Sequence, residues 1–240
     1  MDRPRVTIHN LISLDGRLDG FPADVGLYYE LAARFPHEAI LTGSTTVLAA
    51  AASQGIDMSK EDPQPPPAPT GPAAAREPLP ILVIVDSRGR LTRYAWLRGQ
   101  PFWRDVLVLC SGATPAGHLA LLHRHNVIHL VAGDSRVDLG AALRALAERH
   151  QVTAVRVDAG GALNGALLSA GLVDEISVVI APYLAGGTRA GSLRLIAGAN
   201  GDEALSLDLT AVDRLRQGHV WLRYAVRAYG ITGVRPHEVT

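Results

Sequence analysis

Short runs of β-branched and other apolar residues alternate with segments of helical periodicity along the first two thirds of the chain. This alternation predicts an α/β protein in which helices cover the faces of a mostly parallel sheet. Strands are expected at Arg5–Ile12, Ala39–Leu41, Pro80–Asp86, Asp105–Leu109, Val127–Val131 and Val152–Val157. Helices are expected at Leu27–Phe35, Pro115–His125, Leu139–His150 and Ala162–Ala170.

The final third of the chain has a different pattern. Asp174–Tyr183, Leu205–Val212 and His219–Ala228 are typical of long strands, and no helical segment separates them. Strands joined without a crossover helix pair in antiparallel fashion, so we expect a mixed sheet. With 240 residues, 48% of them hydrophobic and 19% charged, the chain is expected to form a single globular domain over residues 1–240.

A proline-rich segment interrupts this pattern at about residues 49–80. Eight of the 15 prolines lie between Pro63 and Pro80, and apolar periodicity is absent. Loops of this length are usually functional lids or connectors. The sequence favours neither a lid nor a solvated insertion without a role.

Charge and cysteine content exclude several function classes. The 23 basic and 23 acidic residues cancel, so the chain has no net positive charge to attract nucleic acid non-specifically. A local basic patch stays open, and no nucleic-acid partner is expected. Cys110, the single cysteine, excludes an intramolecular disulfide and a cysteine-based zinc site, which favours a cytoplasmic protein. No apolar run approaches the length of a membrane span, so no membrane partner is expected. His123, His125 and His129 lack helical ligand spacing, so no metal is expected.

Three polar turns follow predicted strands, where ligands gather in open α/β sheets. Ser13–Gly16 contains Asp15 in an Asp-Gly pair that also suits an ordinary turn. Gly43–Thr46 can present backbone N–H groups to a phosphate or simply begin a helix. Asp158–Leu163 places adjacent glycines between a strand and a helix, which lets a ligand approach the backbone closely. This last turn is the strongest candidate for a ligand site.

Taken in order, these turns resemble a known family. The segments Ser13–Gly16, Ala39–Val47, Val85–Leu91, Asp158–Leu163 and Ala170–Gly187 resemble the reductase domain of riboflavin biosynthesis, which also exists as a free-standing pyrimidine reductase. The resemblance covers roughly residues 4–228. It implies a dihydrofolate-reductase-like fold with helices on both faces of the sheet, NADPH as hydride donor, and a homodimer. It also implies reduction of the ribosylamino group of a pyrimidinone 5′-phosphate to a ribitylamino group.

Matching positions to the family's motifs suggests roles for individual residues. Positions that the resemblance assigns to cofactor binding are Ile12, Gly43, Thr46, Gly160, Gly161, Ala162, Leu163 and Asn164. Asp158 stands where the family has a substrate-facing glutamate, and it is our first catalytic candidate, with Asp15 as the weaker one. Because lysine is nearly absent, a substrate phosphate is expected to meet arginine, with Arg17, Arg34 and Arg76 unranked.

Two departures from the family pattern leave the substrate open. Ala50 stands where the family commonly has an aspartate, so one cofactor contact is either missing or supplied from elsewhere, with Asp62 as the candidate. Asp158 is one methylene shorter than the family's glutamate. The leading interpretation is an NADPH-dependent reductase of the riboflavin-pathway pyrimidine. One alternative is the same chemistry on a pterin or another small heterocycle, and another is a non-catalytic nucleotide-binding dimer.

Overall fold

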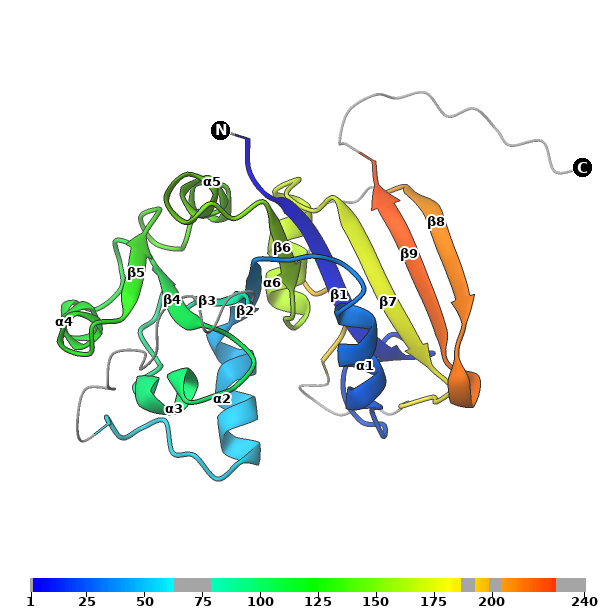
Figure 1. Ribbon diagram of the computed structural model, residues 1–240, viewed down its shortest axis with the longest axis horizontal. Coiled ribbons are helices and arrows are strands. Elements are labelled where there is room, and N and C mark those ends of the chain that lie inside the picture. The colour runs from blue at the N-terminus through cyan, green and yellow to red at the C-terminus, as the bar shows by residue number, and fades with distance from the viewer. Residues whose placement is uncertain (1, 63–78, 187–192, 199–203, 228–240) are drawn as a thin grey trace, which may run out of the picture.

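The computed structural model describes residues 2–62, 79–186, 193–198 and 204–227. In these ranges the chain forms a nine-stranded sheet in the order β5-β4-β3-β2-β6-β1-β7-β9-β8 (Figure 1). The strands are β1 (Arg5–Ser13), β2 (Ala39–Gly43), β3 (Ile81–Val85), β4 (Asp105–Cys110), β5 (Ile128–Val131), β6 (Ala154–Val157), β7 (Glu175–Ala181), β8 (Leu207–Arg214) and β9 (Val220–Val226). The helices are α1 (Val25–Ala32), α2 (Ser44–Ser53), α3 (Tyr94–Arg98), α4 (Ala116–Arg124), α5 (Leu139–His150) and α6 (Gly161–Ser169), with a 3₁₀ turn η2 (Arg216–Gly218).

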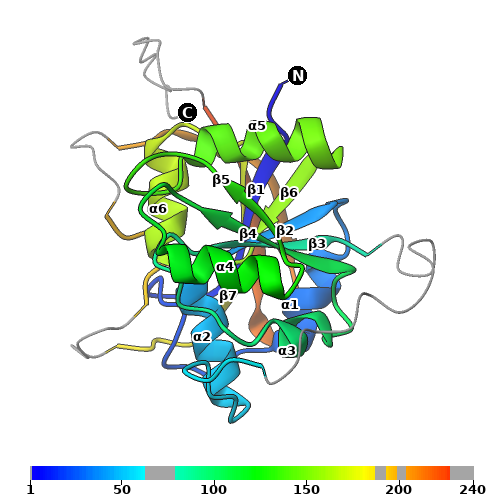
Figure 2. The same cartoon turned by 90° about the vertical axis from the view of Figure 1, so that its left-hand side faces the viewer.

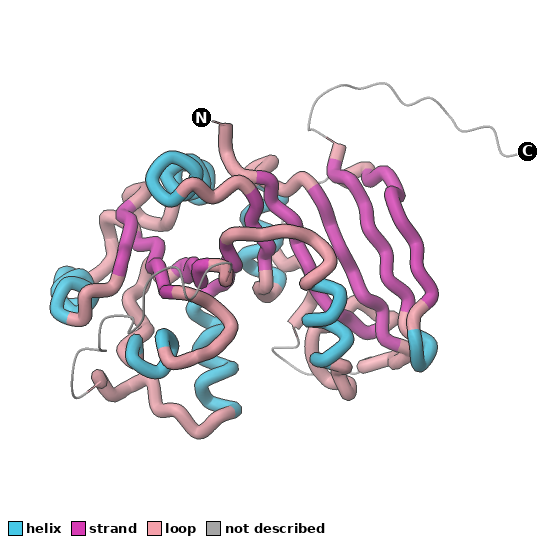
Figure 3. Tube along the Cα trace, in the orientation of Figure 1, coloured by secondary structure: helices cyan, strands magenta, loops and turns pink. Residues whose placement is uncertain are grey.

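Strands β1 to β7 run parallel, and β9 pairs antiparallel with both β7 and β8. Figure 3 shows β7, β9 and β8 side by side with no α-helix between β8 and β9. The mixed sheet expected from the sequence is therefore confirmed, and its antiparallel end is the part that lacks crossover helices.

Helices cover both faces of the sheet (Figure 2). On one face, α5 and α6 bury Leu143, Leu146 and Leu167 against the apolar side of the central strands. On the other face, α2, α3 and α4 pack over β2, β3 and β4, and α1 packs over β1, β7 and β9. Because β3 and β4 are buried on both faces, their sequences are almost continuously apolar, whereas the equally buried β1 also carries polar residues such as Thr7, His9 and Asn10.

Two helices differ from the sequence-based expectation. Helix α2 runs from Ser44 to Ser53, into the segment that was expected to be a loop from residue 49, and α3 was not predicted. Alanines 49–52 give no amphipathic periodicity, but alanine has the highest intrinsic helix propensity, which explains the longer helix. Residues 54–62 form the first part of the loop, and residues 63–78 lie outside the described residues, so the choice between lid and insertion stays untested.

The parallel strands bring the turns that follow them to one edge of the sheet. β6 lies between β2 and β1, so the turn after Val157 adjoins the turns that follow Gly43 and Ser13. The backbone N–H of Asp158 donates to the carbonyl of Leu41 at 2.9 Å, which extends the β2–β6 pairing to the start of the glycine turn. This edge carries the candidate site.

Candidate active site

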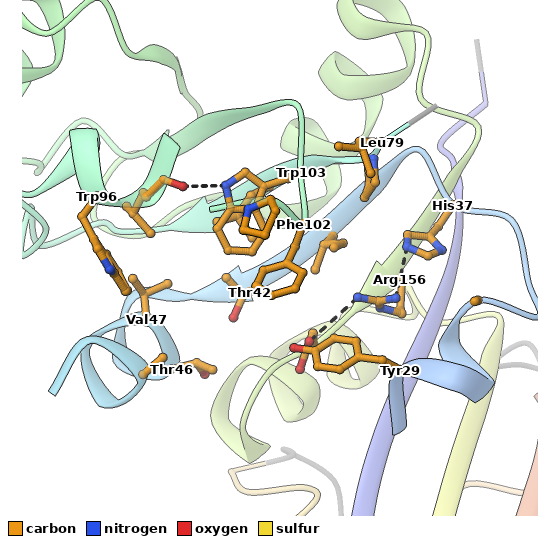
Figure 4. Close-up of a pocket in the computed structure, with 18 residues that line it drawn as sticks. Tyr29, His37, Thr42, Thr46, Val47, Leu79, Trp96, Phe102, Trp103 and Arg156 are labelled. Atoms are coloured by element: carbon orange, nitrogen blue, oxygen red, sulfur yellow. Dashed lines mark hydrogen bonds and ion pairs between the residues drawn. The ribbon is translucent and has the colours of Figure 1, made fainter. Parts of the chain in front are cut away.

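Two adjoining cavities open at the carboxyl edge of the central strands. One, of about 460 Å³, is lined by the turn Gly160–Leu163 and is called here the glycine-turn cavity. The other, of about 420 Å³, is called the aromatic cavity because Tyr29, Trp96, Phe102 and Trp103 line it (Figure 4). Tyr29, Thr46 and Asp158 line both cavities. A group that reaches Asp158 can therefore be approached from two sides.

The two glycines of the turn have different environments. A Cβ built on Gly160 would meet no atom within 4 Å, so this position leaves open space beside the chain. A Cβ on Gly161 would lie 2.4 Å from the carbonyl oxygen of Arg194 and 2.9 Å from the nitrogen of Ala197. Gly161 thus allows a close approach of two backbone segments, whereas Gly160 keeps the cavity open.

The glycine turn also begins helix α6 at Gly161. The N–H groups in the first turn of a helix have no intrahelical acceptors, and the helix dipole gives this end a partial positive charge. No side chain caps this end of α6. An elongated ligand carrying an anionic group fits these properties, and the residues present therefore suit a dinucleotide phosphate.

The sequence-predicted cofactor residues fall into two groups. Those that line the glycine-turn cavity are Gly43, Thr46, Gly160, Gly161, Ala162 and Leu163. Ile12 and Asn164 line neither cavity. Ile12 belongs to the core, and the fully buried Asn164 amide nitrogen donates to the Asn10 side chain and to the carbonyls of Ala159 and Leu195. Asn164 therefore holds the glycine turn in place. That Ile12 and Asn164 contact the cofactor stays a prediction.

Asp158 lies at the junction of the two cavities with 31% of its side chain exposed. Burial raises the pKa of its carboxyl group, and Arg156, whose guanidinium lies 4.0 Å away, opposes that rise. The Arg156 guanidinium also donates to Nε2 of His37 at 3.1 Å. Burial and the neighbouring Arg156 lower the pKa of His37. This favours an unprotonated imidazole, which can accept the hydrogen bond from Arg156. The raised pKa makes Asp158 a candidate proton donor.

Asp15 occupies a different place from Asp158. Its carboxylate accepts hydrogen bonds from Ser13 Oγ at 2.7 Å and from the backbone N–H groups of Ala185 and Gly186 at 2.9 and 3.0 Å. These hydrogen bonds hold the pKa of Asp15 far below its usual range. Asp15 lines neither cavity, so the structure does not bring the two catalytic candidates together. Its contacts tie the turn after β1 to the segment after β7.

A third cavity, of about 590 Å³, adjoins the glycine-turn cavity through Gly43, Thr45, Ala162 and Leu163. We call it the arginine cavity because Arg88, Arg90 and Arg136 line it. Arg90 donates to Ser44 Oγ at 2.7 Å and to Thr45 Oγ1 at 2.8 Å. Among the described residues, neither Arg88 nor Arg136 has a carboxylate partner.

Sequence reasoning identified Thr46 and Asp158 in the aromatic cavity but missed its aromatic side chains and Arg156. Arg156 was the detectable signal, because an arginine between Val155 and Val157 is unusual in a strand that is buried on both faces. Phe102 and Trp103 lie in a loop after α3, and no periodic pattern links them to Tyr29 on α1. Their convergence is a tertiary contact that the local sequence does not encode.

The structure also places Ala50 and Asp62, the two positions considered for one cofactor contact. Ala50 lines the aromatic cavity, but Asp62 does not replace the missing carboxylate there. Its oxygens accept from Arg93 Nε and from the backbone N–H of Ala95, both at 2.7 Å, and so fix the start of α3.

Within the described ranges, no three His, Cys, Asp or Glu side chains converge in a way that would hold a metal ion. Every helix among these residues is too short or too polar to span a lipid bilayer.

Comparison with known proteins decides the family. The model of the RibD C-terminal domain family matches residues 4–220. The chain belongs to the RibD C-terminal domain family. The chain is 29% identical over 197 residues to the 2,5-diamino-6-ribosylamino-4(3H)-pyrimidinone 5′-phosphate reductase of Methanothermobacter thermautotrophicus, covering 80% of this chain and 83% of the relative. The resemblance inferred from the ordered turns is confirmed.

Two further relatives show that the domain also occurs within longer proteins. The riboflavin biosynthesis protein RibD of Escherichia coli is 34% identical over 157 residues, which are 64% of this chain and 39% of that protein. The solved structure of RibD from Acinetobacter baumannii aligns with a TM-score of 0.64 at 23% identity, covering 94% of this chain and 58% of that one. This structural likeness shows that the two share a fold, and the expected fold class is confirmed.

Proposed function

We propose that this RibD C-terminal domain is an NADPH-dependent reductase that converts the ribosylamino group of a diaminopyrimidinone ribosyl 5′-phosphate to a ribitylamino group. One observation carries the proposal. Asp158, a carboxyl group with a raised pKa, lies where a cavity built on a glycine turn meets a second cavity. A reductase that transfers a hydride from a dinucleotide to a small molecule needs two binding cavities that meet at the reacting atoms. The Methanothermobacter relative, which is named for reduction of this ribosylaminopyrimidinone 5′-phosphate, supports the choice of substrate.

The cofactor is proposed to lie along the glycine-turn cavity, with its pyrophosphate at the start of α6 and its adenosine end in the arginine cavity. Arginine is suited to phosphate because its planar group donates several hydrogen bonds and stays charged. NADPH differs from NADH by one 2′-phosphate, and Arg88 and Arg136 have no carboxylate partner among the described residues. We therefore propose that these two side chains favour NADPH over NADH.

The chain's own groups would act on the substrate as follows. NADPH, when bound, supplies a hydride to C1′ of the sugar. Asp158 would hold a proton on its carboxyl group and give it to the ring oxygen of the sugar as the bond from C1′ to that oxygen breaks. Arg156 would then stabilise the resulting carboxylate from 4.0 Å. Hydride and proton together account for the two hydrogens gained.

A second candidate is the same reduction on a pterin or another small heterocycle without phosphate. The aromatic cavity favours it, since its walls are mostly apolar and include four large aromatic side chains, and its one arginine already contacts Asp158 and His37. Comparing turnover of the phosphorylated pyrimidine with turnover of a dihydropterin separates the two candidates. Faster turnover of the dihydropterin would contradict the first candidate.

Calorimetry tests the cofactor part of the proposal. We expect tight NADPH binding that is lost in Gly160→Val, because the added side chain enters open space in the cavity without disturbing the backbone. Arg88→Met and Arg136→Met should each weaken NADPH binding about tenfold and leave NADH binding unchanged. Arg149→Met, at an exposed position of α5 that lines neither cavity, serves as the matched control. Unchanged NADPH affinity in both cavity variants would refute the assignment of the arginine cavity.

A homodimer is also proposed. Leu209 and Val212 on β8, at the edge of the sheet, are 57% and 58% exposed, and an exposed apolar edge strand favours pairing with another chain. Light scattering should give twice the chain mass for the wild type and a single chain mass for Leu209→Lys with Val212→Lys. A monomeric wild type would contradict this part of the proposal.

A further inference from the structure

The aromatic cavity has two polar atoms that are buried without a partner. Thr42 Oγ1 and Arg156 Nε have no hydrogen-bond partner among the described residues, although each residue is only 4% exposed. Both residues line the aromatic cavity, and Thr42 points its hydroxyl toward the space between Thr46 and Tyr29 (Figure 4). Buried polar groups are nearly always paired, so these two indicate hydrogen bonds that a bound molecule completes.

The walls of the same cavity carry exposed aromatic rings. The Tyr29 and Phe102 rings are parallel to within 2°, with centroids 6.2 Å apart, and the two residues are 46% and 54% exposed. Large aromatic residues are seldom left this exposed in a cavity without a function. A planar ring packed against this pair would bury both of them, and offset stacking adds to the gain from burial.

The described lining of the cavity is poorly suited to a phosphate. Arg156 is the one arginine or lysine in it, and its guanidinium is already engaged by His37 and Asp158. Of the arginines expected from the sequence to meet a phosphate, Arg17 and Arg34 lie outside this cavity, and Arg76 is outside the described residues. A dianion placed here would be desolvated among apolar walls, which carries a large free-energy cost.

We infer that the aromatic cavity binds the heterocyclic ring of the substrate, and that the sugar phosphate lies outside it. This inference rests on the proposed function and adds the orientation of the substrate. The ring packs against Tyr29 and Phe102, and its polar edge pairs with Thr42 Oγ1 and the Nε–H of Arg156. C1′ of the sugar, which is joined to the ring through one nitrogen, then lies beside Asp158, where the two cavities meet.

The two halves of the substrate provide the test. Trp96 and Trp103 line the cavity, so binding there changes tryptophan fluorescence. The free base 2,5,6-triamino-4(3H)-pyrimidinone should change this fluorescence, and ribose 5-phosphate should neither change it nor displace the base. Displacement of the base by ribose 5-phosphate, or failure of the base to bind, would overturn the inference.

Two variants locate the base. Thr42→Val removes only the hydroxyl and should weaken base binding about fivefold, whereas Phe102→Ala should weaken it about tenfold. Thr42→Val should also melt at or above the wild-type temperature without ligand, because it removes an unpaired buried oxygen. Thr153→Val, at an exposed position that lines neither cavity, is the control. Base affinity unchanged in both cavity variants would place the ring elsewhere and overturn the inference.

NADPH affinity and NADPH oxidation are measured in parallel on the same samples. Both cavity variants should keep wild-type NADPH affinity, since Thr42 and Phe102 do not line the glycine-turn cavity. If the base binds as expected but NADPH is not oxidised with the complete substrate, the proposed function fails while the ring site stands. If NADPH is oxidised but the base does not bind, the orientation fails alone.

Discussion

Substituting Gly161 with alanine should destabilise the fold, whereas the same change at Gly160 should not. The new Cβ at Gly161 would lie 2.4 Å from the Arg194 oxygen, and ordinary contacts begin near 3.4 Å, so one segment must move by about 1 Å. That movement is resisted by the bond from Ala197 N–H to the Gly161 carbonyl at 3.0 Å and by the bond from Asn164 to the Leu195 carbonyl at 2.9 Å. Overpacking of this kind costs about 1–3 kcal/mol.

Differential scanning calorimetry measures the effect. For a chain of this size, a loss of ~2 kcal/mol lowers the melting temperature by about 5 °C. Gly160→Ala should stay within about 1 °C of the wild type, because its Cβ meets nothing within 4 Å and its backbone is extended, with φ −80° and ψ 171°. Equal melting temperatures for the two variants would refute the claim that Gly161 sits against the segment from Leu193 to Gly198.

Two further predictions concern titration. Burial raises the pKa of Asp158 above its unfolded value, so its ionisation costs folding free energy at neutral pH. Asp158→Asn should melt above the wild type at pH 7, lose this advantage as the pH falls through the raised pKa, and have none left once the pH reaches the unfolded value of about 4. A lower melting temperature for Asp158→Asn at pH 7 would contradict this. His9 is fully buried with its pKa lowered to about 4, so the unfolded chain takes up a proton before the folded one does as the pH falls from 7. The free energy of unfolding should therefore fall by about 3 kcal/mol by pH 4 in urea titrations, and His9→Asn should lack that part of the fall.

The fold was predictable from the sequence where local signals agree. The helix expected at Leu139–His150 has those bounds in the structure, because Asp138 caps its first turn and leucines recur at helical spacing. The glycine turn was likewise found from its position after a β-branched strand. Helix α2 extended past the expected start of the loop because alanines 49–52 carry propensity without periodicity.

The candidate site was only partly predictable, for a physical reason. Asp158 and the glycines are consecutive in the chain, so one local pattern contains them. The aromatic cavity joins Tyr29 on α1, Thr42 on β2 and Phe102 in a loop, and only the packing of α1 and α3 on the same face brings them together. The sequence does not predict that Thr42 Oγ1 lacks a hydrogen-bond partner, because threonine is common in strands for conformational reasons alone.

The most direct test of the central claim is NADPH oxidation, followed at 340 nm, with the diaminopyrimidinone ribosyl 5′-phosphate as substrate. We expect the wild type to form one ribitylamino product per NADPH consumed. In Asp158→Asn the rate should fall at least a hundredfold while NADPH affinity is retained. Binding of both molecules without any oxidation of NADPH would contradict the reductase assignment and leave a non-catalytic nucleotide-binding protein.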